Sequence, residues 1–120
     1  MKVLVSSQGP TLDSPLDLRF GRAACFLLVD TLSLDFSVVE NSQNLNLPQG
    51  AGIQAGKIAV STGADAVITG NCGPKAFDVL KTAGLEVVVN ASGRVIDAVQ
   101  NYKNGQLSST AAPNVEGHWA

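Results

Sequence analysis

The second half of this chain alternates between helix-like and strand-like segments, and that order restricts its possible folds more than any other feature. Residues 52–63, 74–84 and 94–105 have the small and apolar spacing and the closing glycines that are typical of helices. Residues 66–70 and 86–90, which lie between these helices, are short apolar runs that predict buried strands. Strands joined through helices usually pair in parallel, so this half of the chain predicts the parallel part of a sheet.

The first third of the chain predicts three strands and no helix. Residues 3–6 and 24–30 are apolar runs, and residues 35–41 alternate in the manner of a half-exposed strand. A polar loop and a turn near Ser33 separate the three segments, which favours an antiparallel meander. A meander followed by alternating helices and strands predicts an α/β domain, a three-layer α/β/α arrangement with a mixed sheet and helices on both faces.

The length of 120 residues suits one domain. We expect residues 1–107 to form a single α/β domain and residues 108–120, which are rich in Ser, Ala and Pro, to be a loosely held C-terminal tail. Ser92 is the expected N-cap of the last helix, and Gly105 its stop.

Charge and hydropathy narrow the range of partners. The formal net charge is −2, which gives no general footprint for nucleic acid or for an anionic membrane. No apolar run reaches the roughly 18–20 residues of a membrane span, and the N-terminus lacks the apolar core of a signal peptide. We therefore expect a cytoplasmic monomer that binds neither nucleic acid nor membrane.

The side chains that catalysis usually needs are scarce. His118 is the only histidine, and Cys25 and Cys72 are the only cysteines, with neither a C-x-x-C motif nor a disulfide framework. Cys25 lies in an apolar run and is expected in the core, whereas Cys72 and His118 remain candidate metal ligands. A Ser–His or Cys–His pair would require the tail to fold back over the domain. These observations favour a binding protein without catalytic residues over an enzyme.

The sequence GNCGPK, residues 70–75, is the clearest candidate binding loop. It follows a predicted strand and places Pro74 at the first position of a helix, where backbone N–H groups and the helix dipole favour an anion. It is not a Walker phosphate loop, because Gly70 and Gly73 are too close together and no Ser or Thr follows Lys75. A tight turn that binds no ligand fits the same residues.

Several segments together resemble one family. They are LDLRFGRA (16–23), GAG (50–52), GADAVITGNCGPKAFDVLKTAGLEV (63–87) and YKNGQL (102–107). In this combination the chain resembles the dinitrogenase iron–molybdenum cofactor biosynthesis family of the NifX/NafY type, over about residues 1–107. The resemblance implies a ribonuclease H-like motif with a five-stranded mixed sheet and a role in carrying a metal-containing cofactor.

Two further stretches refine what the resemblance implies. SSQGP (6–10) and the PNV-x-x-H tail (113–118) are similar to members of the family that carry a molybdenum–copper sulfide cluster without covalent attachment. Where several relatives have a histidine before the FG of the first motif, this chain has Arg19, which cannot be an ordinary metal ligand but can pair with an anion. The partners implied are cofactor-assembly proteins or ATPases of the MinD/ParA kind.

We therefore expect non-covalent binding of an anionic metal–sulfur cluster, a molybdenum–copper sulfide cluster above all, in a basic, glycine-rich pocket. The alternatives are an iron–molybdenum cofactor precursor or iron–sulfur cluster as cargo, a nucleotide-binding regulatory module, and a pure interaction protein that docks through helix 52–63. The residues expected to bind the cofactor are Arg19, Arg22, Gly50, Ala51, Gly52, Gly70, Asn71, Cys72, Gly73 and Lys75.

Overall fold

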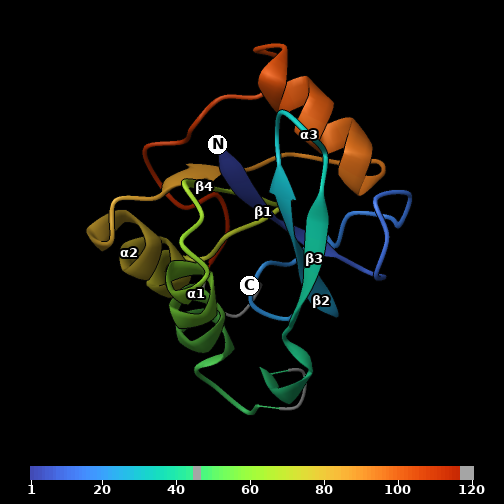
Figure 1. The fold of residues 1–120 in the computed structure, drawn as a ribbon. Helices are drawn as coiled ribbons and strands as arrows, with labels where there is room; N and C mark the ends of the chain where they lie inside the picture. Colours follow the sequence, from blue (N-terminus) through green and yellow to red (C-terminus); the bar gives the residue numbers. More distant parts are fainter. Residues whose placement is uncertain (45–46, 117–120) are drawn as a thin grey trace.

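A five-stranded mixed sheet forms the centre of the protein in a computed structural model, which describes residues 1–44 and 47–116 (Figure 1). The strand order across the sheet is β3-β2-β1-β4-β5. The strands are β1 (Lys2–Ser7), β2 (Cys25–Asp30), β3 (Phe36–Glu40), β4 (Ala66–Ile68) and β5 (Glu86–Val88).

Strand β1 joins an antiparallel half of the sheet to a parallel half. On one side it pairs antiparallel with β2, from Lys2 opposite Asp30 to Ser7 opposite Cys25, and β2 pairs antiparallel with β3. On its other side β1 pairs parallel with β4, which pairs parallel with β5. The predicted meander and the predicted parallel part are both confirmed.

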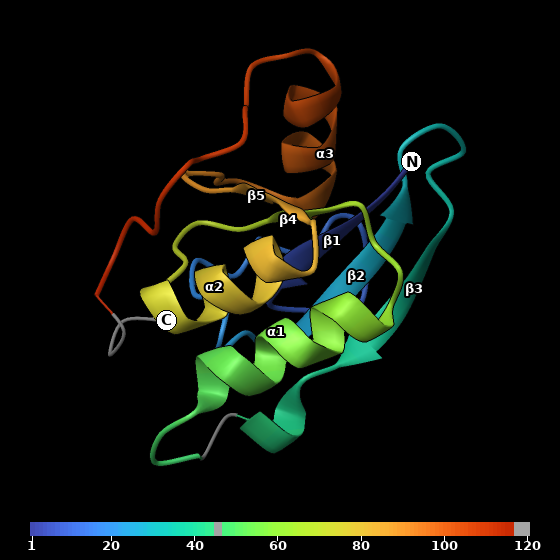
Figure 2. The same ribbon diagram turned by 90° about the vertical axis from the view of Figure 1, so that its left-hand side faces the viewer.

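Three helices cover the two faces of the sheet. Helices α1 (Ala51–Ser61) and α2 (Pro74–Thr82) lie on one face, and α3 (Val95–Lys103) lies on the other (Figures 1 and 2). Each face has its own buried apolar cluster, with Phe26 and Leu80 in the first and Leu27 and Val99 in the second. This arrangement confirms the three-layer α/β/α prediction. Within the described residues, no helix has the length and apolar character needed to cross a membrane.

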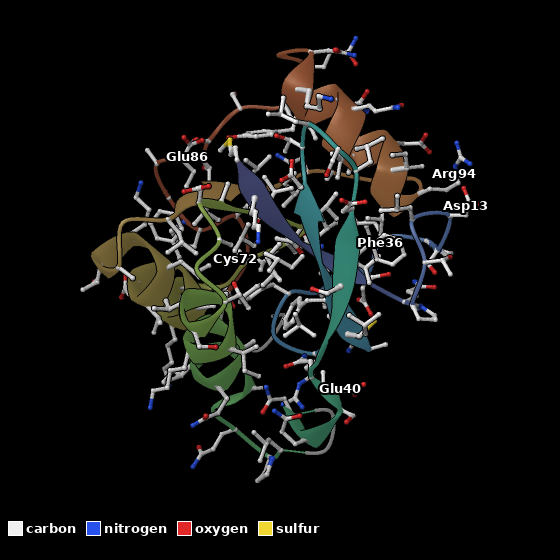
Figure 3. All side chains as sticks on the ribbon, viewed as in Figure 1. Asp13, Phe36, Glu40, Cys72, Glu86 and Arg94 are labelled. Atoms are coloured by element: carbon white, nitrogen blue, oxygen red, sulfur yellow. The ribbon has the colours of Figure 1, made fainter. Side chains whose placement is uncertain are left out.

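The start of α3 differs from the prediction, because Arg94 and not Ser92 is its N-cap. The Asp97 side chain accepts a hydrogen bond from the Arg94 backbone N–H at 3.2 Å, so the acidic residue in the first turn closes the helix end. The Arg94 guanidinium also pairs with Asp97 at 3.0 Å. It pairs with Asp13, which lies near it in Figure 3, at 3.0 Å as well. These exposed ion pairs add to the backbone hydrogen bonds that join Val95 to Ser14 and Ile96 to Leu12, which hold this loop against α3.

Part of the segment after α3, where the sequence predicts a loosely held tail from residue 108, is hydrogen-bonded to the domain. Thr110 donates its backbone N–H to the carbonyl of Val87 at 2.8 Å, and Ser109 forms a bridge with Val88. The hydroxyls of Ser109 and Tyr102 both donate to Glu86 Oε2. The tail thus lies along the free edge of β5 and continues toward the start of α2 (Figure 2).

Candidate functional site

Helices α1 and α2 run side by side in the same direction, so their N-terminal ends lie together at one end of the molecule (Figure 2). Glycines on α1 allow this approach. A β-carbon added to Gly52 would lie 3.4 Å from the β-carbon of Ala76, and one added to Gly56 would lie 2.9 Å from Val79 Cγ1. The small residues of α1, the helix through which a pure interaction protein would dock, therefore pack against α2.

A pocket of about 370 Å³ lies between these two helix starts. This volume is within the range of roughly 300–1,000 Å³ that is usual for small-ligand sites. The wall comes from the loop before α1, from the first turns of α1 and α2, and from one arginine of the β1–β2 connection. The lining residues are Arg22, Pro48, Gln49, Gly50, Ala51, Gly52, Ile53, Gly73, Lys75 and Ala76.

The electrostatic character of this pocket is positive. The first N–H groups of any α-helix have no carbonyl partner within the helix, and here the first turns of two helices contribute to one wall. Lys75 and Arg22 add two cationic side chains, and none of the described lining residues is acidic. The chain as a whole carries a net charge of −2, so the positive charge is a local property of this site. Such a site is suited to an anion.

Arg22 also shapes the loop in front of the pocket. It is half-buried, and its guanidinium donates to the carbonyl of Leu47 at 2.8 Å and to that of Asn44 at 3.4 Å. These two contacts hold the chain just before Pro48, Gln49 and Gly50, which line the pocket. Arg22 therefore positions part of the wall in addition to supplying charge.

Cys72 faces the core and not the pocket. Its side chain is fully buried within the cluster between the sheet and helices α1 and α2 (Figure 3). Burial raises the pKa of the Cys72 thiol to about 12, so the thiol stays protonated at physiological pH. Cys72 therefore packs in the core, and its role as a metal ligand stays a prediction from the sequence. In the described part of the chain, no three His, Cys, Asp or Glu side chains are grouped to hold a metal ion, and His118 lies outside the described residues.

Gly70, Asn71 and Arg19 do not line the pocket. The segment 18–20 crosses the loop so closely that a β-carbon on Gly70 would lie 2.9 Å from the Leu18 Cα. Phe20 donates its N–H to the Asn71 carbonyl at 3.2 Å, and the Asn71 side chain donates to the Leu18 carbonyl at 3.1 Å. Arg19 is exposed on this crossing segment.

The structure thus places six of the ten predicted residues in the pocket lining and leaves four outside it. Those that line it are Arg22, Gly50, Ala51, Gly52, Gly73 and Lys75, and those that do not are Arg19, Gly70, Asn71 and Cys72. Sequence reasoning missed Pro48, Gln49, Ile53 and Ala76. None of these side chains is charged or a usual metal ligand, so nothing in the sequence marks them. They line the pocket because the starts of α1 and α2 lie together.

The chain belongs to the dinitrogenase iron-molybdenum cofactor family, whose sequence profile matches residues 1–105. It is similar to the orange protein of Desulfovibrio gigas, known from a high-resolution structure of the apo form, with 40% identity and a TM-score of 0.92 over 95% of this chain and 96% of that one.

Two further relatives widen the comparison. The NMR structure of the Thermotoga protein TM1290 is 34% identical with a TM-score of 0.81, and covers 97% of this chain and 98% of that one. An uncharacterized protein of Methanocaldococcus jannaschii, MJ0580, is 26% identical over 101 residues, which is 82% of this chain and 85% of the relative.

Proposed function

We propose that this protein binds and carries an anionic metal–sulfur cluster, held without covalent ligands in the pocket between the N-terminal ends of α1 and α2. One observation carries this proposal. Two helix starts and two cationic side chains surround a cavity whose described lining has no acidic residue. The chain also belongs to the dinitrogenase iron-molybdenum cofactor family.

The lining favours a bulky sulfide anion over a small oxyanion. Ala51, Ile53 and Ala76 place apolar surface beside the backbone N–H groups and the two cations. Sulfide ligands spread their charge over large, polarizable atoms, which such a mixed surface can contact. A small oxyanion could use the same N–H groups and cations, but it would leave the apolar part of the lining uncontacted.

The cargo that we propose is a molybdenum–copper sulfide cluster. The 40% sequence identity with the orange protein of Desulfovibrio gigas supports this choice within the family. The buried position of Cys72 supports it too, because an iron–sulfur cluster or a cofactor precursor is usually held by thiolates or imidazoles. Arg19, Gly70 and Asn71 would act indirectly. They would fix the loop 70–72, which is followed by the pocket residues Gly73 and Lys75.

We further propose that the protein is a non-enzymatic carrier that works as a cytoplasmic monomer. Its protein partners would be cofactor-assembly proteins or ATPases of the MinD/ParA kind, which would receive or regulate the cluster. Non-covalent binding suits transfer, since charge-assisted contacts can be released without breaking a metal–protein bond.

An anaerobic titration of the apo-protein with tetrathiomolybdate and copper(I), followed by visible absorption and elemental analysis, tests the proposal. The wild-type chain should develop new visible bands at a fixed ratio of molybdenum to copper, with roughly micromolar affinity. Lys75→Ala should weaken binding about tenfold. Lys81→Ala is the matched control, because it removes the same charge from the last turn of the same helix and should leave the affinity unchanged.

The other outcomes separate the alternatives. Uptake of iron and sulfide would contradict the molybdenum–copper cargo and favour an iron-containing one. Thermal stabilisation by ATP without any coloured species would favour a nucleotide-binding module. A protein that takes up neither metal nor nucleotide would contradict the proposal and favour a pure interaction protein.

A further inference from the structure

The side chain of Asn114, in the segment after α3, is hydrogen-bonded to the loop that follows β4. Its Oδ1 accepts the backbone N–H of Cys72 at 2.8 Å, and its Nδ2 lies 3.2 Å from the carbonyl of Gly70 and 3.2 Å from Asn71 Oδ1. The backbone N–H of Asn114 donates to the carbonyl of Cys72 at 3.2 Å. One residue of the tail thus contacts three consecutive residues of the loop.

Asn114 also reaches the neighbouring strand end. Its Nδ2 lies 3.5 Å from Asn90 Oδ1, and the backbone N–H of Asn90 donates to the carbonyl of Gly70 at 2.8 Å. The chains that leave β4 and β5 and the tail are therefore joined at one carboxamide. An asparagine side chain suits this place because it has donors and an acceptor on one planar group.

The loop is held from two sides. On its inner side the Cys72 side chain is fully buried in the core, and on its outer side Asn114 satisfies the backbone of the same residue. Gly73, the next residue, is the N-cap of α2 and lines the pocket together with Lys75 and Ala76. The direction in which the first turn of α2 presents its N–H groups thus depends on a segment that does not itself line the pocket.

We infer that Asn114 is a positioning residue of the anion pocket: by fixing the loop 70–72 it orients the first turn of α2 toward the first turn of α1. This inference deepens the proposed function and rests on it for the identity of the ligand. Because tail docking and ligand binding favour the same loop conformation, each should stabilise the other.

The test compares full-length wild-type protein with Asn114→Ala and with Asn104→Ala, which changes an exposed asparagine at the end of α3. Two quantities are measured well below the melting temperatures. The first is the set of backbone amide shifts and exchange rates in the apo-protein, by NMR. The second is the dissociation constant for tetrathiomolybdate with copper(I).

In Asn114→Ala we expect the Cys72 amide to exchange faster and the amide resonances of Gly73, Lys75 and Ala76 to move, while those of Ala51 and Gly52 stay in place. The dissociation constant should rise about tenfold. Asn104→Ala should match the wild type in both measurements. If Asn114→Ala does not fold, Asn114→Ser takes its place. It should show smaller changes in the same amide shifts and in the dissociation constant, because a serine hydroxyl can replace only some of the carboxamide's hydrogen bonds.

Two results would overturn the inference. One is a wild-type amide pattern at Gly73, Lys75 and Ala76 in the Asn114 variant, and the other is an altered pattern with unchanged affinity. If the wild-type chain itself does not bind the probe, the proposed function fails. The apo-protein spectra then still decide whether Asn114 orients the first turn of α2.

Discussion

Gly56 of α1 lies against Val79 of α2 so closely that a β-carbon at position 56 would come within 2.9 Å of Val79 Cγ1. This contact sets the separation of the two helices. Since the pocket is bounded by their first turns, the packing of their middle turns determines how near the two sets of N–H groups lie.

The first prediction concerns this helix contact. Gly56→Ala should cost up to about 2 kcal/mol of unfolding free energy, because overpacking outweighs the gain in helix propensity. Gly52→Ala is the matched control: its β-carbon would lie 3.4 Å from its nearest neighbour, so the propensity gain should leave it at least as stable as the wild type. Urea unfolding of both variants measures the difference, and equal stability would contradict the packing argument.

The second prediction concerns Gly50, the N-cap of α1, which has a φ of +83° and no atom within 4 Å of an added β-carbon. Only the backbone conformation therefore penalises a side chain there. Gly50→Ala should lose about 1 kcal/mol of stability. Gly50→Asn should lose less, because asparagine tolerates the left-handed region better. Thermal unfolding of the two variants checks the order, and a more stable alanine variant would show that the loop adopts another conformation.

The third prediction separates the two roles of Arg22. Arg22→Lys keeps the positive charge but loses the forked contact with the carbonyls of Leu47 and Asn44. We expect the affinity for tetrathiomolybdate with copper(I) to fall severalfold in Arg22→Lys and further in Arg22→Ala. Arg94→Lys is the control, since Arg94 pairs with Asp13 and Asp97 away from the pocket. Full affinity in Arg22→Lys would mean that charge alone matters.

The fourth prediction follows from the buried thiol of Cys72. Its pKa is raised from 9.0 to about 12 by burial, so the native state holds this proton where the unfolded chain releases it. The stability that this thiol contributes is complete below pH 9 and is lost as the pH rises toward 12, by up to about 1.4 kcal/mol per pH unit.

Denaturant unfolding between pH 8 and 10 tests whether the free energy of unfolding falls as the pH rises. Wild-type stability should fall over this range, and Cys72→Ala should fall less steeply. Tyr102, whose pKa is also raised to about 12, begins to contribute only above its ordinary value of 10.0. Native Cys72 should also resist alkylation at pH 8 and react once the chain unfolds. Rapid alkylation of the native protein would contradict the buried position.

Local patterns in the chain allowed most of the secondary structure to be predicted. Pro74 and the glycines that follow the helices mark helix ends, and the apolar runs mark strands, because these preferences act over a few neighbouring residues. The N-cap of α3 was predicted at Ser92 and lies at Arg94, since Gly93 has a φ of +83° and separates Ser92 from the helix.

By itself the sequence determined the order of strands and helices, the three-layer class and the presence of an anion-favouring loop with Lys75. Only the tertiary structure decided which of these residues share a pocket. Gly52 meets Ala76 across two helices, and Asn114 meets Gly70 across 44 positions of the chain. The physical reason is that helix packing and tail docking depend on the fit between distant surfaces, which no local pattern of residues encodes.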